Sequence, residues 1–157
     1  MTKQIDAKLF RSELFDLLDE TFENQHGIYL DKGTSLFETL AGIDAADASR
    51  PVGQKCATLA AQVAHVTFYL EVLERYIQTD DAGQVDWGEI WRTVAAVTPE
   101  EWTGLNRKLR ETYQRVMMLL RTIDDWEAEG KLGGALAILV HTAYHLGEMR
   151  QALCTLK

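Results

Sequence analysis

The spacing of apolar residues is the feature that most restricts the fold of this chain. In four long segments, apolar side chains recur every three or four residues, the period of an α-helix with one buried face. These segments cover about residues 5–23, 54–77, 99–128 and 132–155. No stretch alternates apolar and polar residues long enough to indicate a strand, and no hairpin turn separates two apolar runs. The sequence therefore predicts an all-α protein.

Local signals at helix starts support this assignment. The stretch TPEE at 98–101 combines an N-cap threonine, a proline at the first helical position and a capping-box glutamate. The stretch SLFE at 35–38 has the same capping-box form and predicts a short helix over about 36–42. A second short helix is expected over 86–97. Together these elements predict a four-helix up-and-down bundle with two short helices in the connections, forming one domain over 1–157.

Charge and composition exclude several classes of function. The net charge is −8, from 24 acidic and 16 basic residues, and such a field repels the phosphates of nucleic acids. No apolar run reaches the roughly 18–20 residues that a membrane span needs, and charges interrupt the N-terminus where a signal peptide would be apolar. We therefore expect a cytoplasmic protein that binds neither nucleic acid nor membrane. The two cysteines, Cys56 and Cys154, are expected to be unpaired.

The fourth segment places two histidines one helical turn apart. His141 and His145 differ by about 40° around the helix axis, so both imidazoles lie on one face. Glu148 falls about 20° to the other side of His141. The residue after His141 is Thr142, not the glutamate of a zincin motif, so the pair supplies metal ligands without a built-in base.

A third histidine in the second long segment is the candidate to complete a metal site. If the second and fourth long helices run parallel, His65 lies about 11 residues from its helix start. His141 and His145 lie about 9 and 13 residues from theirs, so all three share one level of the bundle. Three converging imidazoles, with positions left for water, are typical of an open divalent-metal site. The alternative is that they are hydrogen-bonded core residues in a purely structural helical protein.

Neighbouring residues extend this candidate site. Glu148 could act as a base towards a metal-bound water, orient an imidazole from behind, or form a surface ion pair. Gln62 and Tyr69 flank His65 at one turn on either side, and could contact a metal-bound water or simply pack. Tyr144 lies about 60° from the ligand face and is a candidate for the pocket mouth.

Other aromatic and imidazole side chains have simpler interpretations. His26 follows the first helix beside a glycine and is interpreted as a loop residue, not a fourth ligand. Trp87, Trp91 and Trp102 flank one connection. Core packing explains them most simply, while a pocket rim or a dimer surface is the functional alternative.

The histidine-bearing stretches resemble those of the DinB-like (YfiT-like) metalloenzyme superfamily. The resemblance rests on AQVAHVTFYLEVL in the second long segment and on HTAYHLGEMRQAL near the C-terminus. The stretch SLFETLAGI and a linker ending in RPVG also match, so the resemblance covers essentially the whole chain. It implies a four-helix bundle, often dimeric, in which His65, His141 and His145 bind nickel, zinc or a similar divalent ion. It also implies transferase or isomerase chemistry with a low-molecular-weight thiol, although many members have no known activity.

The sequence thus leads to two functional hypotheses. The first is an enzyme in which a metal held by three histidines activates a water or thiol, giving hydrolase or thiol-dependent transferase or isomerase chemistry on a small electrophile. The second is a metal- or small-ligand-binding helical dimer without turnover. Nickel or zinc is the expected ion, with iron, copper and manganese as alternatives. A homodimer is expected because residues 132–146 are apolar around most of the helix and VMMLL at 116–120 adds apolar surface.

Overall fold

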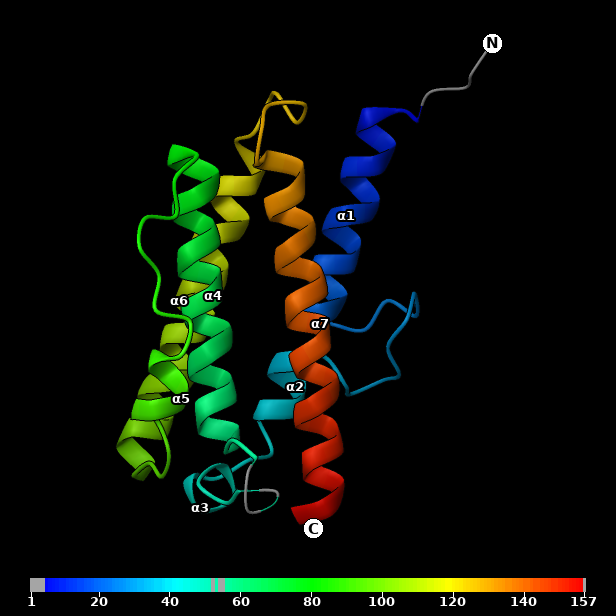
Figure 1. Ribbon diagram of the computed structural model, residues 1–157. Coiled ribbons are helices and arrows are strands. Elements are labelled where there is room, and N and C mark those ends of the chain that lie inside the picture. The colour runs from blue at the N-terminus through cyan, green and yellow to red at the C-terminus, as the bar shows by residue number, and fades with distance from the viewer. Residues whose placement is uncertain (1–4, 52, 54–55, 157) are drawn as a thin grey trace. The chain divides into compact units, whose positions relative to one another are not determined.

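Helices form nearly all the regular structure of the chain. The computed structural model describes residues 5–51, 53 and 56–156 of the 157. Within them the only β-type pairing is an isolated bridge between Pro51 and Thr58. The helices in this part are α1 (Ala7–Phe22), α2 (Leu36–Leu40), α3 (Ala45–Ala48), α4 (Leu59–Thr79), α5 (Glu89–Thr93), α6 (Pro99–Arg121) and α7 (Lys131–Leu156) (Figure 1). The prediction of an all-α protein with four long helices is confirmed.

One additional short helix and one helix boundary differ from those expected. The short helix α3 lies in a stretch that lacks a long apolar period, and the side chain of Asp44 caps it by accepting the N–H of Asp47. Helix α6 ends at Arg121 and does not continue to about residue 128, because the side chain of Asp125 accepts backbone N–H groups and forms a turn. The expected start of the second long helix, at residue 54, lies outside the described residues.

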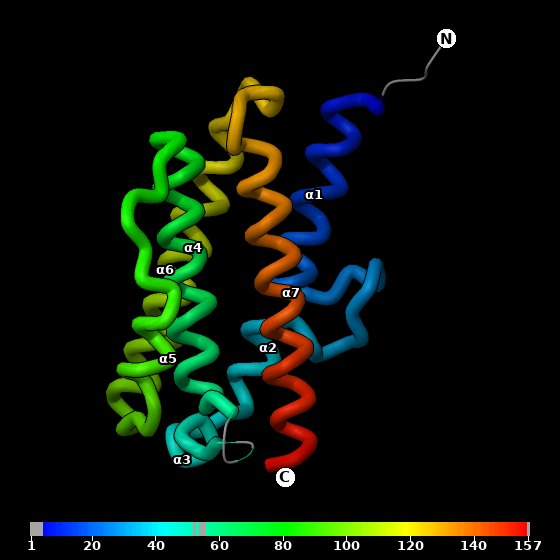
Figure 2. Tube along the Cα trace, in the orientation of Figure 1, coloured from blue at the N-terminus to red at the C-terminus, as the bar shows by residue number. Residues whose placement is uncertain are grey.

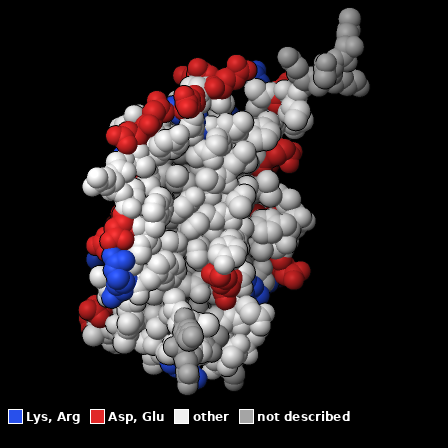
Figure 3. Space-filling model, viewed as in Figure 1, with Lys and Arg blue, Asp and Glu red and all other residues white. Residues whose placement is uncertain are grey.

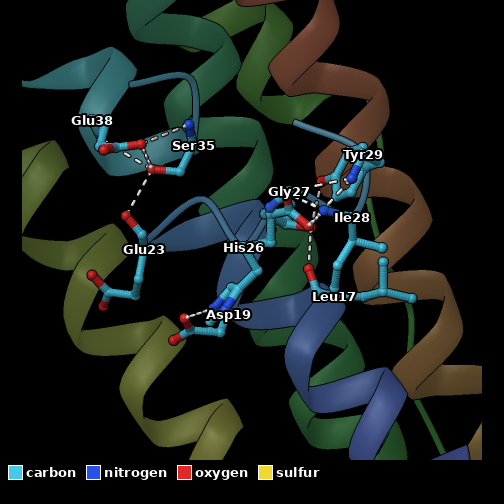
Figure 4. A network of polar contacts seen from close by, with 11 residues as sticks. Leu17, Asp19, Glu23, His26, Gly27, Ile28, Tyr29, Ser35 and Glu38 are labelled. Atoms are coloured by element: carbon cyan, nitrogen blue, oxygen red, sulfur yellow. Dashed lines mark hydrogen bonds and ion pairs between the residues drawn. The ribbon is translucent and has the colours of Figure 1, made fainter. Parts of the chain in front are cut away.

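The chain divides into two compact units, up to Gly42 and from Ile43 onward. The first unit contains α1 and α2. Both members of the predicted capping box of α2 are present, since Ser35 and Glu38 exchange side-chain and backbone hydrogen bonds. The Ser35 hydroxyl also donates to the carbonyl of Glu23 at 2.8 Å, which ties α2 to the end of α1 (Figure 4).

A carboxylate near the end of α1 organises the loop of the first unit. Glu20 is inaccessible to solvent, and its two oxygens accept the backbone N–H groups of four consecutive loop residues, Gly27, Ile28, Tyr29 and Leu30, at 3.0–3.4 Å. The chain can turn around the carboxylate because Gly27 has a φ of 79°. Burial raises the pKa of Glu20, but the four N–H donors together lower it by more than burial raises it. The net shift is therefore downward.

The second unit contains the three other long helices. Lys108 and Arg115 of α6 form ion pairs with Glu71 and Glu74 of α4, at 3.0 Å each, so residue numbers rise together and α4 and α6 run parallel. The segment 80–98, which includes α5, runs back along α4 from its end to the start of α6, as the green and yellow-green trace in Figure 2 shows.

Helix α7 runs antiparallel to α4. Near the end of α4, the backbone carbonyl of Ile77 accepts a hydrogen bond from Lys131, at the start of α7. Further along, His65 meets His141. The close approach depends on Gly134, because a Cβ there would lie 2.7 Å from a side-chain carbon of Ile77. The predicted parallel arrangement of the second and fourth long helices was therefore wrong.

The reason lies in the connection between α4 and α6. Its end is fixed near the start of α4, where the Thr58 hydroxyl donates to the carbonyl of Ala95 at 2.9 Å. The connection therefore brings the chain back to the level where α4 starts before α6 begins. Within the second unit, the chain direction reverses only between α6 and α7. Because α4 and α7 are antiparallel, Cys56, just before α4, and Cys154, near the end of α7, belong to the same end of this helix pair. Both cysteines are free, as predicted. None of the helices described combines the length and hydropathy needed to cross a membrane.

The Glu20 network yields a stability prediction. Glu20→Gln keeps the side-chain shape but removes the charge that receives the four N–H groups, so we expect unfolding free energy to fall by about 1–3 kcal/mol at pH 7. Because the folded-state pKa of Glu20 is lowered, this difference should be complete above the ordinary glutamate pKa of 4.5 and shrink as pH falls through the folded-state value. Urea denaturation at several pH values measures it. Glu13→Gln, an exposed site on α1, is the control, and equal stability of the two variants would contradict the prediction.

Candidate metal centre

The stretch of α4 that carries His65 is buried on every side. Thr58 caps the helix by accepting the N–H of Ala61, and each residue from 58 to 67 is buried. Most of these side chains are apolar or small, which lets α4 lie at the centre of the second unit. His65 is 7% exposed and is the only imidazole in this stretch. A polar ring at such a position requires polar partners.

Helix α7 supplies two imidazoles that face this ring. The Nε2 atoms of His65 and His141 lie 3.2 Å apart. The ring centroid of His145 lies 4.9 Å from that of His65 and 4.5 Å from that of His141. One ring nitrogen from each histidine lies within 4.8 Å of the other two. The protein is therefore an all-helical protein with a three-histidine cluster that could hold a metal ion.

The remaining ring nitrogens of the cluster show how these residues fit a cation. The buried Nδ1 atoms of His65 and His141 have no hydrogen-bond partner in the described structure, while Nδ1 of His145 lies 2.9 Å from Oε2 of Glu148. Among the described residues, His65 and His141 make a hydrogen-bond contact only with each other, which is fewer than hydrogen-bonded core histidines would make, so the structural alternative fits poorly. Two nitrogens that each lie about 2.0–2.1 Å from one zinc ion are about 2.9–3.4 Å apart, a range that includes the separation of the His65 and His141 Nε2 atoms.

All three imidazoles favour the neutral form that metal binding needs. Burial lowers the pKa of His65 to about 4, with a further lowering from His145. Burial also lowers the pKa of His141 to about 3, with contributions from His145 and His65. The pKa of His145 is lowered by burial, which outweighs the opposing effect of Glu148. At neutral pH the cluster thus offers lone pairs and does not repel a cation.

Aromatic rings enclose the cluster. Tyr69 of α4 stacks on His141 with ring centroids 3.5 Å apart and an interplanar angle of 6°. Trp91 of α5 lies over His65 at 4.3 Å, and Trp87 packs against Tyr69 at 5.7 Å. The return segment between α4 and α6 therefore covers one side of the histidines with two tryptophans.

Trp91 and Trp102 have different environments. Trp91 lines the cleft beside the histidines, which matches the pocket-rim alternative. Trp102 is a core residue, buried in α6, whose indole N–H donates to the carbonyl of Ile43 at 2.8 Å.

His26 belongs to the first unit, where it pairs with Asp19 at 2.6 Å, and it is not part of the cluster.

Glu148 lies behind one of the histidines. Its Oε2 lies 2.9 Å from Nδ1 of His145, and this contact opposes, without outweighing, the lowering of the His145 pKa by burial. The Tyr144 hydroxyl also bonds to Glu148, and this bond is the main cause of a raised pKa of Tyr144. The sequence prediction that placed Glu148 near the histidines is consistent with this position.

An open cleft leads to the cluster along α7. It has a volume of about 760 Å³ and is lined by Cys56, Ala57, Gln62, Trp91, Tyr144, His145, Gly147, Glu148, Gln151 and Ala152. Gln62 and Tyr144 were expected at the pocket, whereas Tyr69 stacks on a histidine and is not among the lining residues. Cys56 and Gln151 were not anticipated. Both line the cleft because α4 and α7 are antiparallel, which brings the start of one helix beside the end of the other.

Comparison with protein-family models, curated proteins and solved structures gives no match. The likeness to the DinB-like superfamily therefore rests on the sequence motifs alone.

Proposed function

We propose that this protein is a divalent-metal-dependent enzyme of the DinB-like type, with hydrolase or thiol-dependent transferase or isomerase activity. The observation that carries the proposal is the meeting of three neutral imidazoles, two buried and one half-buried, with one ring nitrogen of each within 4.8 Å of the other two. The adjoining cleft gives a small substrate access to them. Nickel or zinc suits this ligand set, and iron, copper and manganese are alternatives.

Each residue has a specific role in this proposal. His65, His141 and His145 hold the ion, which when bound would lower the pKa of a water or thiol and polarise an electrophile. Glu148 orients His145 from behind through the 2.9 Å contact, and its exposed oxygen can accept a proton from a nucleophile in the cleft. Tyr69 and Trp91 fix the ring planes of His141 and His65.

The proposal makes a prediction about the metal ligands. His141→Ala leaves two ligands, so we expect the protein to lose most of its bound metal, with affinity falling by more than the roughly 10–100-fold typical of an outer-shell change. Elemental analysis after dialysis against a defined metal concentration measures this, with circular dichroism to check folding. The control is His26→Ala, the same change in the first unit. Stoichiometric metal in a folded His141→Ala protein would show that the assignment is wrong.

A second prediction separates the enzyme from a binding protein without turnover. Metal-loaded protein should convert a small electrophile in the presence of water or a low-molecular-weight thiol. Chelation should abolish this conversion and re-addition of metal should restore it, because the activated nucleophile depends on the ion. Full metal occupancy without turnover across hydrolysable esters and thiol–electrophile pairs would instead favour the sensor or scaffold alternative.

The homodimer expected from the sequence stays a prediction. Helix α7 exposes four apolar or aromatic side chains at intervals of four residues, namely Leu132, Leu136, Val140 and Tyr144. If a second copy packs on this stripe, a charge at its centre should disrupt the contact. Sedimentation should give a dimer for the native chain at tens of micromolar and a monomer for Val140→Glu. A monomeric native chain under these conditions would end the dimer hypothesis.

A further inference from the structure

The cleft beside the histidines is strongly biased in charge. Among its described lining residues Glu148 is the only acidic side chain, and none is lysine or arginine. Figure 3 shows that most of the surface over α7 carries no charged side chain, apart from one acidic spot with a few basic atoms beside it. Among the residues of the cleft that the structure describes, a ligand therefore meets one carboxylate and no lysine or arginine.

Two aromatic rings stand beside this carboxylate. The exposed fractions of Trp91 and Tyr144 are 40% and 61%, so both present ring surface to the cleft that they line. Aromatic faces attract organic cations through the negative potential of the ring. The apolar part of the lining, which includes Ala57 and Ala152, suits a small hydrocarbon body.

A buried amide stands beside the carboxylate. Gln62 is only 9% exposed, lines the cleft, and its buried Oε1 has no hydrogen-bond partner in the described structure. An unpaired buried acceptor of this kind is costly, and it adds no positive charge to the cleft. Glu148 can also accept further bonds, since a carboxylate offers about four acceptor sites and its contacts with His145 and Tyr144 use only part of them.

We propose that this cleft selects small organic cations, specifically compounds with a primary ammonium group on a compact apolar body. The ammonium group lies against Glu148 and the faces of Trp91 and Tyr144, and the reacting end of the ligand points towards the histidines. The inference deepens the proposed function and rests on it, because it names the substrate class of that same site. In the metal-free protein, compounds with a carboxylate in place of the ammonium group are repelled by Glu148.

Three probes of matched size test the charge preference. Benzylamine, benzyl alcohol and benzoate share an aromatic body and differ in charge. Each is titrated at pH 7 into the full-length protein freed of metal by chelation, so that none can bind through an ion, and affinity is measured by ligand-observed NMR. We expect benzylamine to bind at least about tenfold more tightly than benzyl alcohol, and benzoate to bind most weakly. Equal binding of the three, tighter binding of benzoate, or no binding by any probe would overturn the inference.

A pair of variants locates the preference. Glu148→Gln should reduce the benzylamine advantage to within about twofold of benzyl alcohol, because it removes the charge and keeps the shape. Glu111→Gln, an exposed acid on α6, should leave the advantage unchanged. If both variants retain it, the cation is attracted by the overall acidity of the protein and the assignment to this cleft is wrong.

Failure of this inference can be told apart from failure of the proposed function. Metal content is measured on separate samples of the same preparations. Metal binding without a charge preference would leave the metal centre standing and remove only the cation selectivity. A charge preference in a protein that binds no metal would support the cation site and contradict the metal-dependent enzyme.

Discussion

The close antiparallel packing of α4 against α7 is the constraint on which the candidate centre depends. At one end Gly134 lets Ile77 approach its backbone, and further along the same contact brings His65 to 3.2 Å from His141. Protein interiors are closely packed, so a larger separation at the first point would be transmitted to the second. A side chain on Gly134 would therefore affect the histidines although it touches none of them.

This packing sets up an energetic conflict that a cation would resolve. One ring nitrogen from each of the three histidines lies within 4.8 Å of the other two, and among the described residues His65 and His141 make a hydrogen-bond contact only with each other. Burial also lowers the pKa values of the histidines, so protonation does not add hydrogen-bond donors to the cluster near neutral pH. An ion between these nitrogens would accept their lone pairs and, by binding only the folded state, would stabilise it. Function and stability are thus linked through the same three side chains.

Periodicity and spacing predicted much of this arrangement but not the path of the chain. The i,i+4 spacing of His141 and His145 determined that they share a face, and the depth of His65 in its helix placed it at their level. That depth argument assumed parallel helices and still led to three histidines that lie together, because His65 reaches the same level from either direction. The direction depends on the segment 80–98, whose contacts, such as Thr58 with Ala95, have no periodic signature. For the same reason the sequence could not decide between core packing and a pocket rim for Trp91.

X-ray absorption spectroscopy of the metal-loaded protein tests the central claim most directly, because it reports the atoms bound to the ion without requiring a substrate. The account predicts one ion per chain, with three imidazole nitrogens at about 2.0–2.1 Å for zinc and the remaining positions taken by oxygen ligands such as water. Imidazole rings give a recognisable scattering pattern, and its amplitude should fit three rings in the native protein. A spectrum with no imidazole contribution, or a chain that retains no ion after incubation with nickel or zinc, would contradict the account.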